Sequence, residues 1–349
     1  MFAEASFTLR SCLRVFLLAS VLVAFFGFAH SAQAQVARTA VPFLQIAPDS
    51  RSAAMGNAGA ALADNANAIF WNPAGLAFQR DAQVGLTHAN WLPQFNADLF
   101  YEYLVGTYHA PGVGTFGGHI TFLNLGESEC RTGPSDADFC GEFRSYDFAG
   151  GVSYGVQLSE QFAIGTGVRA IYSNLSPATE EVSSGKGFSA AFDLSALYRS
   201  RPIALGSADG TVSVGLNLAN MGPTITYTRA KEPLPTNLRF GTAFTIDFDE
   251  YNSLTIANDL NKTIVNVHET RVPVLDENGE PKLDENGEPM FEIETDPDPF
   301  YRAIFTSWGT TEGVTNADGE AESLTLLEQF TVGTGLEYWY NGLFALRTG

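Results

Sequence analysis

The stretch FAIGTGVRAIYS (Phe162–Ser173) decides the fold, because its large apolar residues fall on every second position. One face of an extended chain would carry Phe162, Ile164, Thr166, Val168, Ala170 and Tyr172, and the other Ala163, Gly165, Gly167, Arg169, Ile171 and Ser173. A period of two residues is typical of a β-strand, since successive side chains point to opposite faces. The stretch therefore predicts a strand whose second face is small and polar.

The same alternation recurs in FSAAFDLSALYRS (188–200) and NLRFGTAFTIDF (237–248). Strands of roughly ten to twelve residues exceed the usual five or six of soluble sheets, and when tilted they match the hydrocarbon thickness of a bilayer. Aromatic residues close the apolar faces, as in the girdles of membrane barrels. A soluble sandwich would leave the second face in water, whereas a face of Gly, Ala and Ser suits a crowded lumen better.

The lengths of the connections favour an outer-membrane β-barrel. The expected strands are 83–89, 98–110, 114–123, 143–156, 162–173, 188–200, 211–220, 237–248, 252–261, 329–340 and 343–349. Short turns alternate with long loops, the longest at 262–328, as in barrels with periplasmic turns and extracellular loops. Bacterial barrels use even numbers of strands, so we expect about 14 antiparallel strands and a chain truncated at its C-terminus. NVHETRVPV and PMFEIET, inside the longest loop, are candidates for a further hairpin.

The N-terminus carries the pattern of an export signal. Arg10 and Arg14 precede the apolar run Val15–Phe28, and Ala32-Gln33-Ala34 is a small-x-small cleavage site. We expect a signal peptide at 1–34 and a mature chain in the outer membrane. No later segment approaches 18 uninterrupted apolar residues, so the sequence predicts no membrane-spanning helix.

Charge and cysteine content narrow the chemistry. The net charge of −20 argues against a nucleic-acid partner, because such a chain repels phosphate. Cys130 and Cys140 form a closely spaced pair, which in an exported protein predicts a loop disulfide. A metal site would need further ligands, and none is expected. The sequence indicates no cofactor.

The segment DNANAIFWNPAGLAF (Asp64–Phe78) follows the Ala/Gly-rich AAMGNAGAALAD (Ala53–Asp64). A barrel of about 14 strands has a lumen too wide for its own side chains to fill. A compact, Pro-broken segment of small residues before the first strand is therefore a candidate plug. We predict a hatch at 35–80 and a barrel domain at 81–349; the alternative is a periplasmic tail.

Charged residues are expected on the lumen face. Arg169 and Asp193 face each other across one hairpin, and Arg239 lies on the same side of its own strand. The full expected set is Arg169, Asp193, Arg239, Asp247, Glu337 and Arg347. These side chains would brace the wall or hydrogen-bond the plug, and neither role requires a catalytic function.

Several segments resemble known families. MGNAGAALAD followed by WNPAGLAF resembles the N-terminal hatch of FadL-type outer-membrane barrels, with the motif at Trp71, Asn72, Pro73, Ala74 and Gly75. Eight segments, in order along nearly the whole mature chain, resemble the PorV family of the type IX secretion system. They are IAPDSRSAAMGNAG, NWLPQFNADLFYEYLVGTYH, ITFLNLGE, LSEQFAIGTGVRAIYSNLS, VGLNLANMGPTITY, LPTNLRFGTAF, DEYNSLTIANDLNK and LEYWYNGLFALRTG.

This resemblance implies a barrel that does no chemistry. Such a protein binds the C-terminal signal domain of secreted cargo arriving from the translocon barrel. It then passes the cargo to an attachment complex with a sortase-like peptidase, which anchors it to lipopolysaccharide in the outer membrane. The cargo domain would meet the long loops around Cys130–Cys140, Leu175–Gly187 and Met221–Pro235.

Three short motifs resemble hydrolase, nucleotide-binding or calcium-binding sequences, but each lacks a feature that its function requires. GVSYG (Gly151–Gly155) fits the G-x-S-x-G of hydrolases, but Ser153 lies within an expected strand and no helix follows. GVGTFG (Gly112–Gly117) fits a nucleotide fingerprint, but it lies in an expected turn between strands. The DENGEP repeats at Asp276 and Asp284 lack the ligand spacing of a calcium loop.

The main rival function is a FadL-like channel for small hydrophobic molecules. It shares the fold and the hatch but requires a continuous apolar path through the lumen. The charged set on the lumen face argues against such a path.

Overall fold

The computed structural model describes residues 39–95, 98–131, 139–177, 185–227, 230–274, 281–282, 289–315 and 321–349. The predicted signal peptide and both aspartates of the DENGEP repeats, Asp276 and Asp284, lie outside the described residues.

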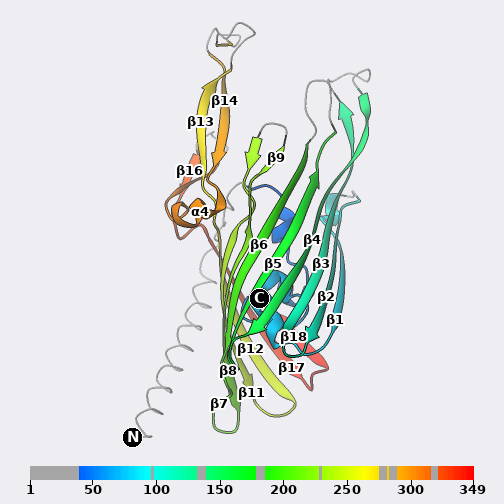
Figure 1. The fold of residues 1–349 in the computed structure, drawn as a ribbon, viewed down its shortest axis with the longest axis vertical. Coiled ribbons are helices and arrows are strands. Elements are labelled where there is room, and N and C mark those ends of the chain that lie inside the picture. The colour runs from blue at the N-terminus through cyan, green and yellow to red at the C-terminus, as the bar shows by residue number, and fades with distance from the viewer. Residues whose placement is uncertain are drawn as a thin grey trace.

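One large antiparallel sheet forms most of the molecule (Figure 1). In spatial order its strands are β1 (Gln83–Asn90), β2 (Phe100–Ala110), β3 (Gly114–Arg131), β4 (Phe139–Gln157), β5 (Phe162–Asn174), β6 (Lys186–Arg199), β8 (Asp209–Met221), β11 (Asn237–Asp247), β12 (Asn252–Thr263), β17 (Phe330–Tyr340) and β18 (Phe344–Thr348). The short β7 (Ile203–Ala204) pairs with β8 and brings the sheet to 12 strands. Each of the eleven expected strands is present.

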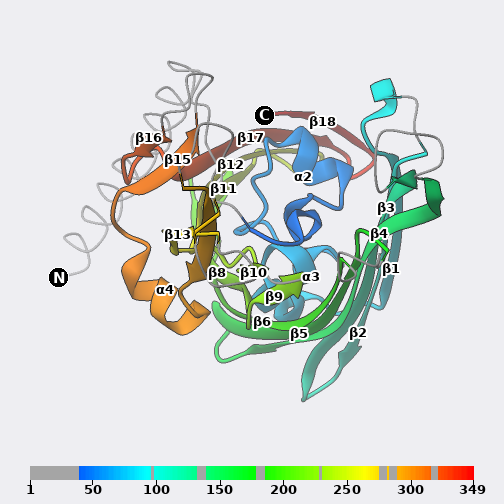
Figure 2. The same cartoon turned by 90° about the horizontal axis from the view of Figure 1, so that it is seen from above.

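The sheet curves around the N-terminal part of the chain (Figure 2). Within the described residues, β1 and β18 end the sheet and do not pair with each other. The all-β, antiparallel class is therefore confirmed, while closure and a count of about 14 strands stay predictions.

The two faces of the sheet differ as the alternation predicted. Along β5, Ala163, Gly165, Gly167, Arg169 and Ile171 are buried against the interior of the curve, and the residues between them face outward. Outward apolar side chains are widely exposed, with Val168 at 54%, Phe188 at 69% and Val84 at 84%. A two-layer soluble sandwich would bury these side chains. Phe244 is an exception, since it shares the register face of Phe240 but is buried.

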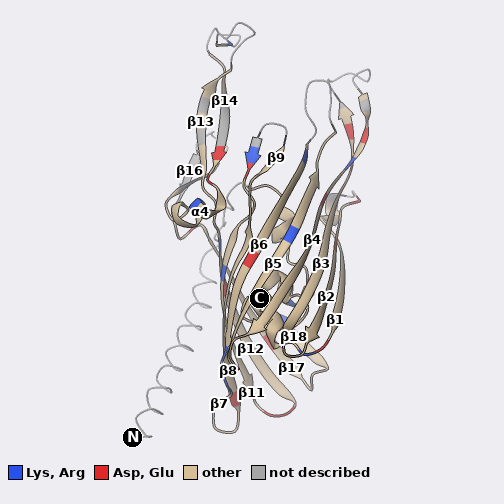
Figure 3. Ribbon diagram, viewed as in Figure 1, with Lys and Arg blue, Asp and Glu red and all other residues tan. Residues whose placement is uncertain are grey.

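Aromatic residues mark both ends of this outward face. Phe148 pairs with Tyr172, and Tyr172 pairs with Phe188, in one row across three strands. Phe162 and Tyr198 pair near the other end. Lys, Arg, Asp and Glu are sparse along the middle of the strands and are commoner near strand ends and in connections (Figure 3). This is the distribution expected of a wall in lipid.

The connections at the two ends of the sheet differ in size (Figure 1). One end has the tight turns, whereas η3 (Pro93–Phe95), in the connection between β1 and β2, lies at the other end. At this other end also project the upper parts of β3 and β4 and three small sheets: β9 (Ile225–Tyr227) with β10 (Ala230–Glu232), β13 (Val267–Pro273) with β14 (Phe291–Pro297), and β15 (Thr311–Thr315) with β16 (Ala321–Leu324). The hairpin expected in the longest loop is thus confirmed as β13–β14, outside the main sheet.

The connection after β8 folds back into the interior of the curve. Ile225 and Leu234 are 0% and 2% exposed and belong to the main apolar core. Ser189 Oγ donates to Pro223 O at 3.0 Å, and Ala40 N donates to Pro233 O at 2.9 Å. This connection therefore covers the N-terminal part of the chain from the side of the long loops.

A helix in the longest loop, α4 (Phe300–Thr306), packs beside the end of β8. Among the described residues, no helix has both the length and the apolar character needed to cross a membrane.

Candidate functional site

The N-terminal residues 39–80, here called the inner segment, lie inside the curve of the sheet (Figure 2). The segment contains η1 (Pro42–Gln45), α2 (Ser50–Ala54), α3 (Ala68–Trp71) and η2 (Pro73–Phe78). Small residues keep these elements close to one another, and most of their side chains are buried. The candidate site is the contact between this segment and the wall.

Local sequence signals explain the short elements. Asp49 caps α2 by accepting Ser52 N at 2.9 Å, and its second oxygen accepts Trp71 Nε1 at 2.9 Å. Asn72 ends α3 and caps η2 by accepting Ala74 N at 3.1 Å. Pro73 occupies the first position of η2, where its missing N–H costs nothing.

The predicted hatch motif is buried and joined to the wall. Asn72 is 0% exposed, and its Nδ2 donates to Ala60 O at 2.9 Å and to Ala196 O on β6 at 3.0 Å. Ala74 N also donates to Ser195 Oγ on β6 at 2.9 Å. Asn217 Nδ2 on β8 donates to Trp71 O at 3.0 Å. Buried backbone groups of the inner segment thereby find partners on the wall, as buried polar groups require.

Position 75 has no room for a side chain, so it requires glycine. A Cβ atom there would lie 2.1 Å from Ala63 O, which is far inside contact distance. Glycine is therefore the residue that lets two turns of the inner segment touch.

Glycines on the inward face of the wall allow the same close approach from outside. A Cβ at Gly165 would lie 2.2 Å from Ala74 N, and one at Gly215 would lie 2.1 Å from Ala60 O. Further inward glycines that meet the inner segment at under 3.0 Å are Gly117, Gly155, Gly241, Gly333 and Gly335. The small face seen in the sequence is thus the surface on which the inner segment packs.

The predicted lumen charges form two pairs, Arg169 with Asp193 and Arg347 with Glu337. Arg169 Nη2 forms an ion pair with Asp193 Oδ2, and both side chains are buried. Asp193 Oδ1 also accepts Asn220 N at 2.8 Å, where Asn220 has φ of 59° and the chain leaves β8. This pair therefore braces the wall at the point where the β8 connection turns inward.

Arg239 instead binds the inner segment. Its Nη1 donates to Phe70 O at 2.7 Å, and its guanidinium carbon lies 4.5 Å from the Phe70 ring centroid and 5.0 Å from that of Trp71. A cation stacked over aromatic faces and hydrogen-bonded to a carbonyl holds α3 at its C-terminal end.

Two anchors were missed in the sequence. Asp259 Oδ2 on β12 accepts Gly59 N at 2.9 Å and Ala60 N at 2.8 Å. Asp259 is buried on β12, and its partners lie about 200 residues earlier, so no local pattern joins them.

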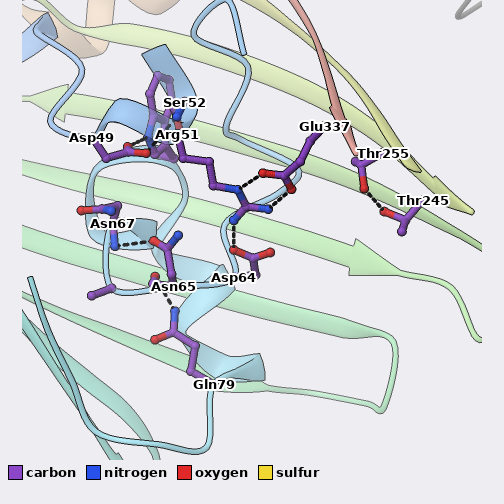
Figure 4. A network of polar contacts seen from close by, with 12 residues as sticks. Asp49, Arg51, Ser52, Asp64, Asn65, Asn67, Gln79, Thr245, Thr255 and Glu337 are labelled. Carbon is purple, nitrogen blue, oxygen red and sulfur yellow. Dashed lines mark hydrogen bonds and ion pairs between the residues drawn. The ribbon is translucent and has the colours of Figure 1, made fainter. Parts of the chain in front are cut away.

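The second is Arg51 of α2, which forms the centre of the network in Figure 4. Its Nε and Nη2 donate to the two oxygens of Glu337 on β17 at 2.8 and 2.7 Å, and its Nη1 contacts Asp64 at 2.5 Å. Arg347 of β18 adds a third cationic contact to Glu337 at 2.5 Å. Burial by itself would lower the pKa of Arg51, but the bonds to Glu337 and Asp64 outweigh burial and raise it. The network ties the inner segment to the last strands of the sheet.

The described residues include only part of the predicted disulfide between Cys130 and Cys140. Cys130 lies near the end of β3, and its register partner on β4 is Gly141, the neighbour of Cys140. The side chain of Cys140 lies outside the described residues, so the disulfide stays a prediction.

The weaker chemical strings fall on structural elements. Ser153 lies inside β4 and is buried against the interior, and GVGTFG forms the turn from β2 into β3. Within the described residues, no group of three or more His, Cys, Asp or Glu is placed to hold a metal ion. One cavity of about 180 Å³ beside the inner segment is lined mostly by polar residues, among them Gln45, Asn57, Asn237, Arg239 and Asn261.

A family model described as "Type IX secretion system protein PorV" matches residues 29–270 of this chain. The match includes the inner segment and every strand of the wall from β1 to β12. The chain belongs to the PorV family. The protein is therefore an outer-membrane component of the type IX secretion system. The search of curated proteins found no match to this chain.

The region after 270 lies outside the match. It contains β14, α4, β17 and β18, so the Glu337 end of the Arg51 network belongs to the unmatched part.

Proposed function

We propose that this PorV-family protein is a non-enzymatic docking platform for secreted cargo. It would bind the C-terminal signal domain of cargo at the end of the barrel that carries the long loops, which would be extracellular. It would then pass the cargo from the translocon barrel to the sortase-like attachment complex.

The observation that carries this proposal is the filled interior. The inner segment is held by Asn72, Arg239, Asp259 and Arg51, and the connection after β8 covers it from the loop side. We propose that residues 41–78 act as a plug. A barrel stoppered in this way offers a rim for binding rather than a bore for passage.

The rim has the extent that a docking surface needs. β3 and β4 are 18 and 19 residues long, against 13 for β5, so their upper parts stand above the neighbouring strands (Figure 1). The β13–β14 hairpin projects on the opposite side of the rim (Figure 1).

Of the three loops expected to meet cargo, one is largely committed to the interior. Leu234 and Ile225 of the Met221–Pro235 loop are buried, although Thr226 and Lys231 remain exposed. We therefore assign cargo contact first to the β3–β4 tip that carries Cys130. The rival, a FadL-like channel for hydrophobic molecules, is weakened by the polar contacts between the plug and the wall.

The test is binding of a purified cargo signal domain to the protein in detergent. Replacing residues 126–142 by a two-residue turn removes the β3–β4 tip but keeps the paired strands below it. The matched control shortens the connection at the opposite end of the sheet, around β7. We expect the first variant to lose at least tenfold in affinity and the control to bind like the wild type. Equal affinity in both variants would refute the assignment of cargo to this tip.

A further inference from the structure

The outward face of the wall has a row of very small residues. Gly150 on β4 pairs with Ala170 on β5, and Ala170 pairs with Ala190 on β6. The outward residues one step towards the long loops are Phe148, Tyr172 and Phe188, and those one step the other way are Val152, Val168 and Phe192. A row without side-chain bulk between two rows of large side chains is a groove across the strands, here called the wall groove.

The wall groove ends where β8 leaves the sheet. The pairing of β6 with β8 shifts register between Phe192 and Leu194, and it stops at Met221. Beyond that point the chain turns inward, so no β8 side chain continues the wall above it. Phe300 of α4 stands there instead, with its ring edge-on to Phe192 at 5.6 Å between centroids.

The resulting cavity has a volume of about 720 Å³ and a mostly apolar lining, in which Arg169 is the one charged residue among those that the structure describes. Val152, Val168, Ala170, Ala190, Met221 and Phe300 line it. This volume falls in the range of pockets that hold small organic ligands. An apolar ligand in the groove would lie against side chains that otherwise face the bilayer.

Charge and aromatic residues near the groove fit a membrane lipid whose headgroup carries phosphate. Lys186 is exposed on the same face of β6, about 13 Å from Ala190 along the strand and beyond the aromatic row. Aromatic rings gather at the level of lipid headgroups, and a cation just outside them attracts the phosphate. Near Phe300, α4 and its flank expose Tyr301, Phe305 and Trp308 at 63%, 80% and 41%.

We propose that the wall groove binds one acyl chain of a phosphate-bearing lipid of the surrounding bilayer, with the lipid phosphate beside Lys186. The proposal uses the outward face of the wall, and it holds whether or not cargo docks at the β3–β4 tip. Phe300 closes the end of the groove beyond Met221, where β8 no longer pairs with β6.

Native mass spectrometry of the delipidated protein in detergent, titrated with dipalmitoyl phosphatidylglycerol, tests this. Ala190→Leu and Ala170→Leu each fill the groove. Ala196→Leu is the matched control, because Ala196 faces outward on β6 three rows further from the long loops. Lys186→Ala tests the headgroup, and dipalmitoylglycerol without a phosphate is the companion probe.

We expect the wild type to hold one phosphatidylglycerol and each groove-filling variant to bind it at least tenfold more weakly. Ala196→Leu should stay within twofold of the wild type. Lys186→Ala should weaken phosphatidylglycerol three- to tenfold and leave dipalmitoylglycerol unchanged.

A wild-type protein that holds no lipid would overturn the proposal, as would equal binding by the two groove-filling variants and Ala196→Leu. Unchanged lipid binding combined with loss of a partner barrel in pull-down would show that the groove is a protein interface instead. If one Leu variant does not fold, lipid binding by the other Leu variant and by Lys186→Ala still tests the proposal.

Discussion

At the scale of single residues, missing side chains matter as much as those present. Gly165 and Gly215 have no Cβ at the places where a Cβ would meet the backbone of the inner segment at about 2 Å. Any side chain there must push two packed layers apart, because interiors are close-packed and resist overfilling.

Gly215→Ala should therefore lower the free energy of unfolding by about 1–3 kcal/mol, since its new methyl would overlap Ala60 O. Denaturant unfolding monitored by tryptophan fluorescence measures the change. Gly118→Ala is the control, because its Cβ would lie 3.6 Å from Gly151 O, at ordinary contact distance. Equal stability of the two variants would contradict the close-packing account.

Glu337 forms ion pairs with two arginines, Arg51 and Arg347. Its side chain is 1% exposed, whereas those of Arg51 and Arg347 are 21% and 23% exposed. Removing one charge from a buried pair usually costs more than the pair contributes, and partial exposure of the arginines reduces that cost.

Glu337→Gln should cost about 2 kcal/mol and should speed hydrogen exchange in α2, which Arg51 anchors. The control is Glu127→Gln, which breaks an exposed pair with Arg144 and should cost under about 0.5 kcal/mol. Unchanged exchange in α2 would show that Arg51 does not hold the inner segment.

At the scale of elements, the strands could be predicted and their partners in the interior could not. The alternation located β5, β6 and β11 to within about two residues. A strand with different environments on its two faces needs different residue types at alternate positions, and this period is visible in the sequence. The upper parts of β3 and β4 were missed, since 124–131 and 139–142 are polar and Gly-containing and show no alternation.

The candidate site was predicted in part for the same reason. The local string around Asn72 predicted a hatch, which stays a prediction, and the inward parity of Arg239 followed from its strand. The bonds of Asp259 and Glu337 join positions 200 and 286 residues apart, so only the folded chain reveals them. The inward fold of β9 and the helix α4 likewise depend on tertiary contacts.

The helix α4 should become less stable in acid. Burial raises the pKa of Asp298, but hydrogen bonds from Thr306 and Asn266 and the charges of Arg302 and His268 outweigh burial and hold the pKa below its ordinary 3.8. The folded state is thus stabilised by the carboxylate at pH values above 3.8. This stabilisation is lost as the pH falls through the lowered pKa.

Hydrogen exchange at Ala303 and Ser307 N–H, between pH 7 and pH 2.5 and corrected for intrinsic rates, measures this loss. Both groups bond within α4, to Pro299 O and Ala303 O at 3.0 Å. Asp298→Asn should expose them at neutral pH and remove the acid dependence. Full protection in the wild type at the lowest pH would contradict the role of Asp298.

At the scale of the whole molecule, the curved sheet has inverted surfaces compared with a soluble protein. Apolar side chains such as Val168 and Phe188 face outward, while Arg169, Asp193, Asp259 and Glu337 are buried around the inner segment. The cost of burying these charges is offset because each is paired or hydrogen-bonded. Such an arrangement is stable when lipid surrounds the wall.

The most direct test of this account is oxygen accessibility of nitroxide labels along β5 in the protein reconstituted into lipid vesicles. Labels at Ile164 and Val168 should collide readily with oxygen and poorly with a water-soluble nickel reagent. Labels at Ala163 and Ile171 should be shielded from both. High access of the nickel reagent at Ile164 and Val168, or uniform shielding at all four positions, would contradict the outward, lipid-facing wall.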